Sequence, residues 1–170
     1  MIDKSYVISF VAVVVTSVMG SYYSAKNTRS EWSPRSTRNS EWYRCIRPAY
    51  LTPPGWVFPI VWTVLYFTLF LVLARAIQRK DWALCGLMAA SLVLNVVWCK
   101  LYFGERRVQD ALWAIGALVA LALAMVAYRW WHGDVHVAKM LVPYTAWLLF
   151  ATLLNYKSVP KLALCAHLEF

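Results

Sequence analysis

Five long stretches without Asp, Glu, Lys or Arg constrain the fold of this chain more than any other sequence feature. They are residues 5–25, 48–74, 82–99, 111–128 and 140–156. A helix of about 18–20 residues crosses a hydrocarbon core of about 30 Å, and each stretch is about that long or longer. Because every backbone N–H and C=O inside a bilayer must be paired within the protein, these stretches are predicted to be α-helices.

The sequence thus predicts an all-α integral membrane bundle of five transmembrane helices in one domain, residues 1–170. Composition agrees, since 61% of the residues are hydrophobic and 15% are charged, against about 45–50% and about 25% in soluble domains. The first stretch also allows a signal peptide, although its apolar part exceeds the usual core of roughly 7–15 residues, and cleavage would leave four helices. The predicted spans are residues 5–23, 55–75, 82–100, 109–130 and 138–157, with a long connection over 24–53.

The basic residues lie between the predicted spans, so membrane topology explains the net charge of +9 better than nucleic-acid binding does. Under the positive-inside rule, the more basic side faces the cytoplasm, which places the C-terminus and the 24–53 connection there. The N-terminal side carries Lys4, Arg75, Arg79, Lys80, Arg129 and Lys139. The opposite side carries Lys26, Arg29, Arg35, Arg38, Arg44, Arg47, Lys100, Arg106, Arg107, Lys157 and Lys161.

The four cysteines and three histidines indicate neither a metal site nor an acid–base site. The cysteines lack CxxC and Cys/His ligand spacing, so they are predicted to be small apolar fillers without a disulfide framework or a zinc site. The histidines lie near span ends, away from partners for acid–base or nucleophilic catalysis. These residues are Cys45, Cys85, Cys99, Cys165, His132, His136 and His167.

Two helical faces carry groups suited to the bundle interior. Asn95 and Trp98 share a face, and a buried amide in lipid needs a partner there. Trp147, Ala151 and Asn155 recur every four residues, a stripe that either lines a pocket or forms a packing seam with a hydrogen-bonded amide. Among the ten tryptophans, Trp62 and Trp147 lie well inside their spans, where an indole N–H needs an acceptor or a ligand.

Prolines mark the entry to the second span. Pro48, Pro53 and Pro54 favour an extended approach, and Pro54 suits the first helical turn because its missing N–H is no loss there. Pro59 is expected to weaken a backbone hydrogen bond and favour a kink, unless it is an ordinary membrane-helix proline.

Three motifs follow one another along the chain. They are Trp42-Tyr43 with Pro48, Pro53-Pro54, Trp56-Val57-Phe58-Pro59-Ile60-Val61-Trp62-Thr63 and Leu65-Tyr66; then Leu94-Asn95-x-x-Trp98 with Tyr102-Phe103-Gly104; then Pro143-Tyr144-x-Ala146-Trp147-x-x-Phe150-Ala151-x-x-Leu154-Asn155-Tyr156. Together they resemble the translocator protein family, also called tryptophan-rich sensory proteins or peripheral-type benzodiazepine receptors.

This resemblance implies a membrane receptor or transporter, commonly a homodimer, in a bacterial envelope or mitochondrial outer membrane. The long connection would act as a lid over a pocket for porphyrins, such as protoporphyrin IX or haem, with no tightly bound cofactor. Ligand contacts would come from Trp42, Pro53, Trp56, Trp62, Asn95, Trp98, Trp147, Ala151 and Asn155.

The resemblance also implies further roles. Sterol binding is suggested by a loose motif of Leu154, Tyr156 and Lys161. Some bacterial relatives promote light-dependent porphyrin breakdown, for which Trp62 and Trp147 would be the participants. A structural or partner-binding protein with a filled core is the third possibility.

Two arginines of the long connection suit the acidic edge of a porphyrin. Arg44 and Arg47 could pair with propionates at the pocket mouth, or form a solvated face of the loop. Lys100, Val159 and the long 24–40 segment depart from the family pattern, so the pocket shape could differ from that of relatives.

Overall fold

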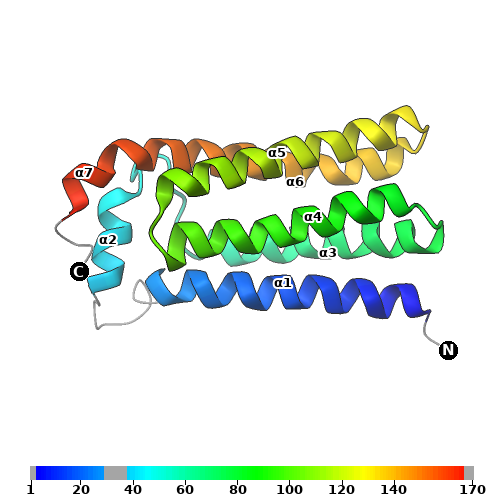
Figure 1. Ribbon diagram of the computed structural model, residues 1–170, viewed down its shortest axis with the longest axis horizontal. Helices are drawn as coiled ribbons and strands as arrows, with labels where there is room; N and C mark the ends of the chain where they lie inside the picture. Colours follow the sequence, from blue (N-terminus) through cyan, green and yellow to red (C-terminus); the bar gives the residue numbers. More distant parts are fainter. Residues whose placement is uncertain (1–2, 29–37, 167–170) are drawn as a thin grey trace.

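The computed structural model describes residues 3–28 and 38–166, without the side chains of residues 25–28 and 38–40. Five of its helices are long and apolar enough to cross a membrane, and Figure 1 shows them side by side along the long axis of the molecule. This confirms the predicted all-α bundle of five transmembrane helices. The helices are α1 (Lys4–Thr28), α3 (Val57–Gln78), α4 (Trp82–Cys99), α5 (Val108–Trp131) and α6 (Val135–Ser158).

Four shorter elements lie at the end of the bundle opposite the N-terminus (Figure 1). The π-helical turn η2 links α4 to α5, while η3 and α7 extend α6. The helix α2 belongs to the connection over residues 24–53, for which the sequence predicts no helix. The four are α2 (Arg38–Ile46), η2 (Lys100–Gly104), η3 (Val159–Lys161) and α7 (Leu162–Cys165).

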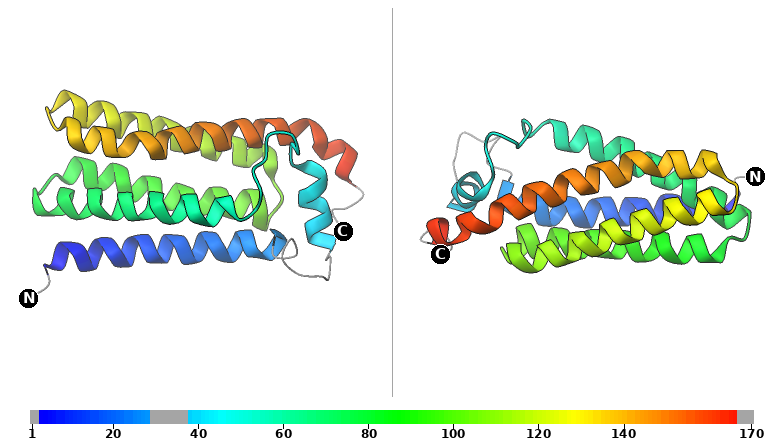
Figure 2. Two further views of the ribbon diagram at one scale, coloured as in Figure 1. Left: turned by 180° about the vertical axis from the view of Figure 1, so that it is seen from behind. Right: turned by 90° about the horizontal axis from the view of Figure 1, so that it is seen from above.

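The bundle buries apolar side chains between its helices and also presents apolar side chains outward. Helices in a bilayer require an apolar outer surface, because the lipid acyl chains around them are as apolar as the protein core. Figure 2 shows α5 and α6 running side by side along their length. The largest fully buried side chains include Leu84, Met88, Ile115, Leu118, Met125, Leu141, Tyr144 and Leu148. Exposed apolar side chains include Val64, Phe67, Val93, Trp113, Leu123 and Leu149.

Aspartates begin two helices at the N-terminal end of the bundle. Asp81 caps α4 and Asp134 caps α6, each accepting a hydrogen bond from the backbone N–H three residues later. Lys80 and Gly133, the residues just before them, have φ values of 56° and 77°, the left-handed conformation that closes a preceding helix. These turns join α3 to α4 and α5 to α6.

A buried arginine connects the two turns. The side chain of Arg129 is 10% exposed and donates to both Asp81 and Asp134. Burial tends to raise the pKa of Asp134, but the N–H of Val137 and the guanidinium groups of Arg129 and Arg75 outweigh it and hold that pKa below its ordinary value. The network ties the α3–α4 hairpin to the α5–α6 hairpin.

The helix α2 is held against the other end of the bundle by its apolar face. Trp42, Tyr43 and Ile46 are buried, while Arg44 on the opposite face is exposed. The ring of Trp42 lies edge-on to Tyr102 with centroids 6.4 Å apart. The connection therefore forms a packed cap on the bundle.

Cys45 of α2 forms a disulfide with Cys165 of α7, so the prediction that all four cysteines are unpaired apolar fillers is wrong for this pair. The two residues are 120 positions apart, with Cα atoms separated by 6.1 Å. Local spacing carries no information about such a pair, which only the packing of α2 beside α7 brings together (Figure 2). Cys85 and Cys99 are free thiols.

Pro59 lies in the first turn of α3, because the helix begins at Val57. The first backbone N–H groups of any helix have no intrahelical acceptor, so the ring removes no helical hydrogen bond. The predicted loss of a backbone hydrogen bond at Pro59 is therefore wrong, and the alternative, an ordinary membrane-helix proline, fits the structure. Its carbonyl instead accepts a hydrogen bond from the Thr63 hydroxyl at 2.8 Å.

Candidate ligand-binding cavity

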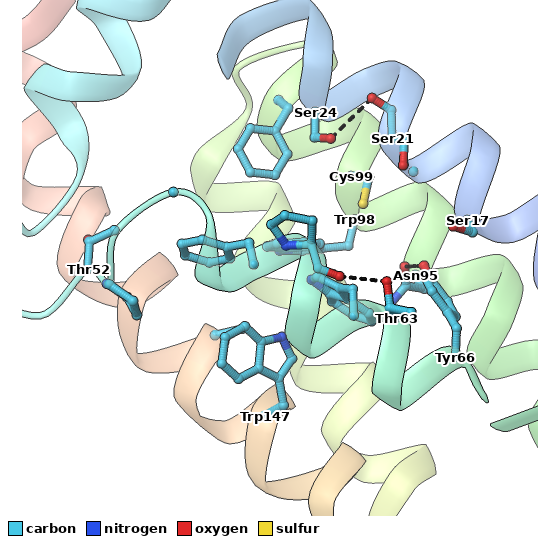
Figure 3. Close-up of a pocket in the computed structure, with 18 of the residues that line it drawn as sticks. Ser17, Ser21, Ser24, Thr52, Thr63, Tyr66, Asn95, Trp98, Cys99 and Trp147 are labelled. Atoms are coloured by element: carbon cyan, nitrogen blue, oxygen red, sulfur yellow. Dashed lines mark hydrogen bonds between the residues drawn. The ribbon is translucent and has the colours of Figure 1, made fainter. Parts of the chain in front are cut away.

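A cavity of about 550 Å³ lies below the α2 end of the bundle, between α1, α3, α4 and α6. Its size is in the range of about 300–1,000 Å³ that is usual for small-molecule sites. Figure 3 shows its lining side chains converging from these helices. They are Ser17, Gly20, Ser21, Ser24, Tyr43, Arg47, Thr52, Pro53, Gly55, Phe58, Pro59, Trp62, Thr63, Tyr66, Asn95, Trp98, Cys99, Phe103, Trp147 and Ala151.

Aromatic rings make up much of the wall. Phe58 of α3 meets Trp147 of α6 edge-on, with ring centroids 5.8 Å apart. Trp62 lies against Tyr66 at 5.2 Å, one turn further along α3. Such rings offer large apolar faces to a ligand while holding one another in place.

Asn95 supplies a polar group in the deeper part of the cavity. Its side-chain oxygen accepts a hydrogen bond from the hydroxyl of Tyr66 at 3.2 Å. The pair joins α4 to α3, and both residues line the cavity. The structure thus gives the membrane-embedded amide the interior partner that its position requires.

Trp98 forms a wall that is fixed from behind. Its indole N–H donates to the side-chain oxygen of Asn155 at 3.0 Å, and the Asn155 amide donates to the carbonyl of Val108 at 2.8 Å. The ring also stacks on Tyr102 at 5.6 Å. Asn155 is fully buried and outside the lining, so the stripe of α6 is both pocket wall and packing seam: Trp147 and Ala151 line the cavity, and Asn155 packs behind it.

The helix α1 contributes a wall of small and hydroxyl-bearing residues, which sequence reasoning missed. Ser17, Gly20, Ser21 and Ser24 lie at i, i+3, i+4 and i+7, one helical face that lines the cavity (Figure 3). A Cβ at Gly20 would lie 3.5 Å from the Cys99 sulfur, so α1 approaches α4 closely here. The sequence shows this spacing, but small residues at helical spacing indicate close helix packing as readily as a cavity wall.

We call residues 38–56, which comprise α2 and the segment that follows it, the lid of the cavity. Arg47, Thr52 and Pro53 line the cavity, whereas Arg44 lies outside it and is exposed. The carbonyl of Arg47 accepts a hydrogen bond from the Lys161 ammonium group at 2.9 Å. Of the two arginines considered for a carboxylate, the structure therefore brings only Arg47 to the cavity.

Six of the nine predicted ligand contacts line the cavity, and three do not. Trp42 is fully buried in the packing of α2, and Asn155 lies behind Trp98. Trp56 is 54% exposed just before α3. The six that line it are Pro53, Trp62, Asn95, Trp98, Trp147 and Ala151.

The three residues of the sterol-type motif do not share one environment. Tyr156 is exposed on α6, and Leu154 is half-buried. Lys161 points to the lid, where it bonds to the Arg47 carbonyl.

Comparison with known proteins agrees with this architecture. The TspO/MBR family pattern matches residues 8–159. The chain is 32% identical to the tryptophan-rich sensory protein of Cereibacter sphaeroides over 120 residues, covering 70% of this chain and 75% of that protein. It is 30% identical over 153 residues to the tryptophan-rich protein TspO of Archaeoglobus fulgidus, covering 88% of this chain and 92% of that protein.

The human translocator protein is 34% identical over 121 residues, which is 68% of this chain and 71% of that protein. The five apolar helices make the chain an integral, multi-pass membrane protein. Because the family pattern and these relatives each cover about two thirds of the chain or more, the chain belongs to the TspO/MBR family.

Proposed function

We propose that this protein is a membrane receptor or transporter that binds a porphyrin-like tetrapyrrole in the cavity under the lid. The observation that carries the proposal is the placement of Trp62, Trp98 and Trp147, from three different helices, around one cavity of about 550 Å³. Large aromatic faces favour a flat, apolar ring as ligand.

The polar groups of the cavity suit the edges of such a ligand. A porphyrin carries carboxylate side chains, and a guanidinium group is the natural partner for a carboxylate. Arg47 lies at the lid side of the cavity, and Ser17 and Ser21 offer hydroxyl groups along α1. The names of the relatives, translocator protein and tryptophan-rich sensory protein, support a role in transport or sensing.

The test is a titration of detergent-purified protein with protoporphyrin IX in the dark, following tryptophan quenching and the melting temperature. We expect saturable quenching and a raised melting temperature, since a ligand that binds only the folded state stabilises it. Trp147→Ala should weaken binding by about tenfold or more, because it removes an aromatic wall.

Trp113→Ala is the matched control. Trp113 is 78% exposed on α5 and does not line the cavity, so this variant should bind like the wild type. Absence of saturable quenching in the wild type, or equal weakening by both variants, would contradict a site in this cavity.

Light-dependent porphyrin breakdown is the second candidate, favoured by the presence of both Trp62 and Trp147 in the lining. Dioxygen would be the oxidant and the bound porphyrin would be the group that is oxidised, while an indole beside the ring would pass electrons from the ring to dioxygen. Illumination of the complex in air should then bleach the porphyrin absorption band more slowly in Trp62→Phe and Trp147→Phe than in the wild type. Equal bleaching in all three proteins would exclude these residues as participants.

A further inference from the structure

Two links at one end of the bundle hold the lid to the C-terminal part of the chain. The first is the disulfide between Cys45 and Cys165, and the second is the hydrogen bond from Lys161 to the carbonyl of Arg47. Arg47 follows Cys45 by two residues and lines the cavity. The covalent link is therefore attached directly to the part of the lid that covers the site.

The disulfide lies beyond the hydrocarbon core. The apolar helical segment Val135–Cys165 has 31 residues, which at about 1.5 Å per residue is longer than the roughly 30 Å that a span needs. The charged network of Asp134 and Arg129 marks the opposite end of this segment. The excess length therefore extends past the membrane at the lid end, where water-soluble molecules have access.

The predicted orientation of the chain makes this disulfide unusual. The lid end is the more basic one, which the positive-inside rule places in the cytoplasm. Disulfides there are opened by cellular thiols, and those that form are usually transient or redox-sensing. Cys45 is partly exposed and Cys165 is 1% exposed, so Cys45 is the more accessible residue of the pair to an incoming thiolate.

We propose that Cys45–Cys165 is a thiol–disulfide exchange site for a dithiol reductant, and that its reduction releases the lid. A thiolate of the reductant attacks the Cys45 sulfur, the bond between the two sulfurs breaks, and Cys165 leaves as a thiolate that takes up a proton. The second thiol of the reductant then attacks the mixed disulfide and frees Cys45. The reductant ends as a disulfide, having supplied two electrons and two protons, and an oxidised dithiol reverses the exchange.

Reduction removes the covalent link without removing the packing of α2. The burial of Trp42 and Ile46 and the hydrogen bond of Lys161 do not involve either cysteine sulfur. The reduced protein should therefore stay folded while the lid opens more often. The expected effect of disulfide reduction on ligand release rests on the proposed function, whereas the expected loosening of the lid does not.

Hydrogen exchange of the lid tests the proposal without any ligand. The amides of Leu51 and Thr52 both donate to the carbonyl of Pro48 at 2.9 Å, which gives the closed lid a measurable protection. Exchange of a peptide over residues 47–56 would be compared with and without dithiothreitol, for the wild type, Cys45→Ser, Cys165→Ser and Cys85→Ser. Cys85 is a free thiol on α4 outside the cavity and controls for effects of the reductant at other sites.

We expect exchange over residues 47–56 to become about tenfold faster on reduction of the wild type and of Cys85→Ser. Both serine variants of the bonded pair should show the fast rate under either condition. Equal exchange rates in oxidised and reduced wild type, or free thiols at both positions in protein purified without reductant, would overturn the proposal. If the serine variants fail to fold, the comparison of oxidised with reduced wild type still decides it.

Release of protoporphyrin IX gives the functional readout. It should become about tenfold faster in reduced protein, since dissociation follows the opening of the lid. If hydrogen exchange of the lid depended on the redox state but the protein bound no porphyrin, the thiol–disulfide exchange site would be supported and only the proposed ligand would be contradicted. If neither porphyrin release nor hydrogen exchange of the lid depended on the redox state, only the thiol–disulfide exchange site would be contradicted.

Discussion

Trp98 donates its indole N–H to the side-chain oxygen of Asn155 at 3.0 Å, a bond that joins α4 to α6 just behind the cavity. The same amide donates to the carbonyl of Val108 at the start of α5. One buried side chain thus connects three helices and sets the orientation of an aromatic wall. Ligand binding should depend on Asn155 even though Asn155 lies outside the lining.

Asn155→Leu should destabilise the protein and weaken porphyrin binding together. Interhelical hydrogen bonds in membranes contribute about 0.6–2 kcal/mol each, and this substitution removes two. It also leaves the indole N–H and the Val108 carbonyl without these partners. Melting temperature and titration with protoporphyrin IX would measure the two effects.

A double-mutant cycle with Trp98→Phe separates the contributions. If the Asn155 effect on stability is unchanged in the Trp98→Phe background, the hydrogen bond between them carries no coupling energy and the positioning role is wrong.

Sequence periodicity places Asn95 and Trp98 of α4 on a face suited to the bundle interior, and it leaves open whether the α6 stripe lines a pocket or forms a packing seam. The family resemblance assigns Asn95, Trp98 and Trp147 to a ligand pocket, and the structure brings all three to one cavity. The serines of α1 were missed because small residues at helical spacing favour close packing as readily as a ligand wall. Periodicity shows which residues share a helical face, but it does not show whether that face contacts a ligand or another helix.

Trp42→Ala should disturb the lid far more than Trp56→Ala. Trp42 is fully buried against Tyr102, and the Arg106 guanidinium lies 5.3 Å from its ring centroid. Removing a buried Trp costs about 3–5 kcal/mol in a well-packed site. Trp56 is largely exposed, so its loss should leave stability and binding within experimental error. Hydrogen exchange over residues 47–56 and the porphyrin titration would measure the effect of each variant on the lid and on binding. A stronger effect of Trp56→Ala than of Trp42→Ala would contradict the packing described for α2.

Arg47→Gln should weaken binding of protoporphyrin IX by about three- to tenfold at low salt, because one ion pair at a partly solvated site contributes about 1 kcal/mol. Arg44→Gln is the matched control, since Arg44 lies three residues away on the outer face of α2. The dimethyl ester of the porphyrin should bind both variants and the wild type alike. A similar loss for the ester would mean that Arg47 acts on lid packing and not on a carboxylate.

The arrangement of the lid could not be predicted from sequence, and the reason is its dependence on long-range packing. The segment over residues 24–53 shows prolines and charges, which indicate a connection, and its short helix is stabilised by burial of Trp42 and Ile46 against the bundle. The bond of Cys45 to Cys165 depends in the same way on two segments meeting in space. Long apolar runs, by contrast, identify membrane helices without reference to any partner.

Asp134 should make stability depend on pH at the end of the bundle away from the lid. Its folded-state pKa lies below the ordinary value of 3.8, so its stabilising effect is fully present above that value and is lost as the pH falls through the folded pKa. Asp134→Asn should lower the free energy of unfolding at pH 7 by about 1–3 kcal/mol, because Arg129 loses a charged partner. The variant should also lose less stability than the wild type as the pH falls below about 4.

Melting temperatures from pH 7 downward would measure both effects, with Asp110→Asn as the control. The Asp110 side chain is 48% exposed and paired with Arg107 at the surface, so its substitution should change stability by less than about 1 kcal/mol. If Asp134→Asn and Asp110→Asn behaved alike at pH 7, the buried network would contribute no more than a surface ion pair. The Arg129 network would then not be the link that fixes the α3–α4 hairpin to the α5–α6 hairpin, and the rigidity of that end would have to come from apolar packing alone.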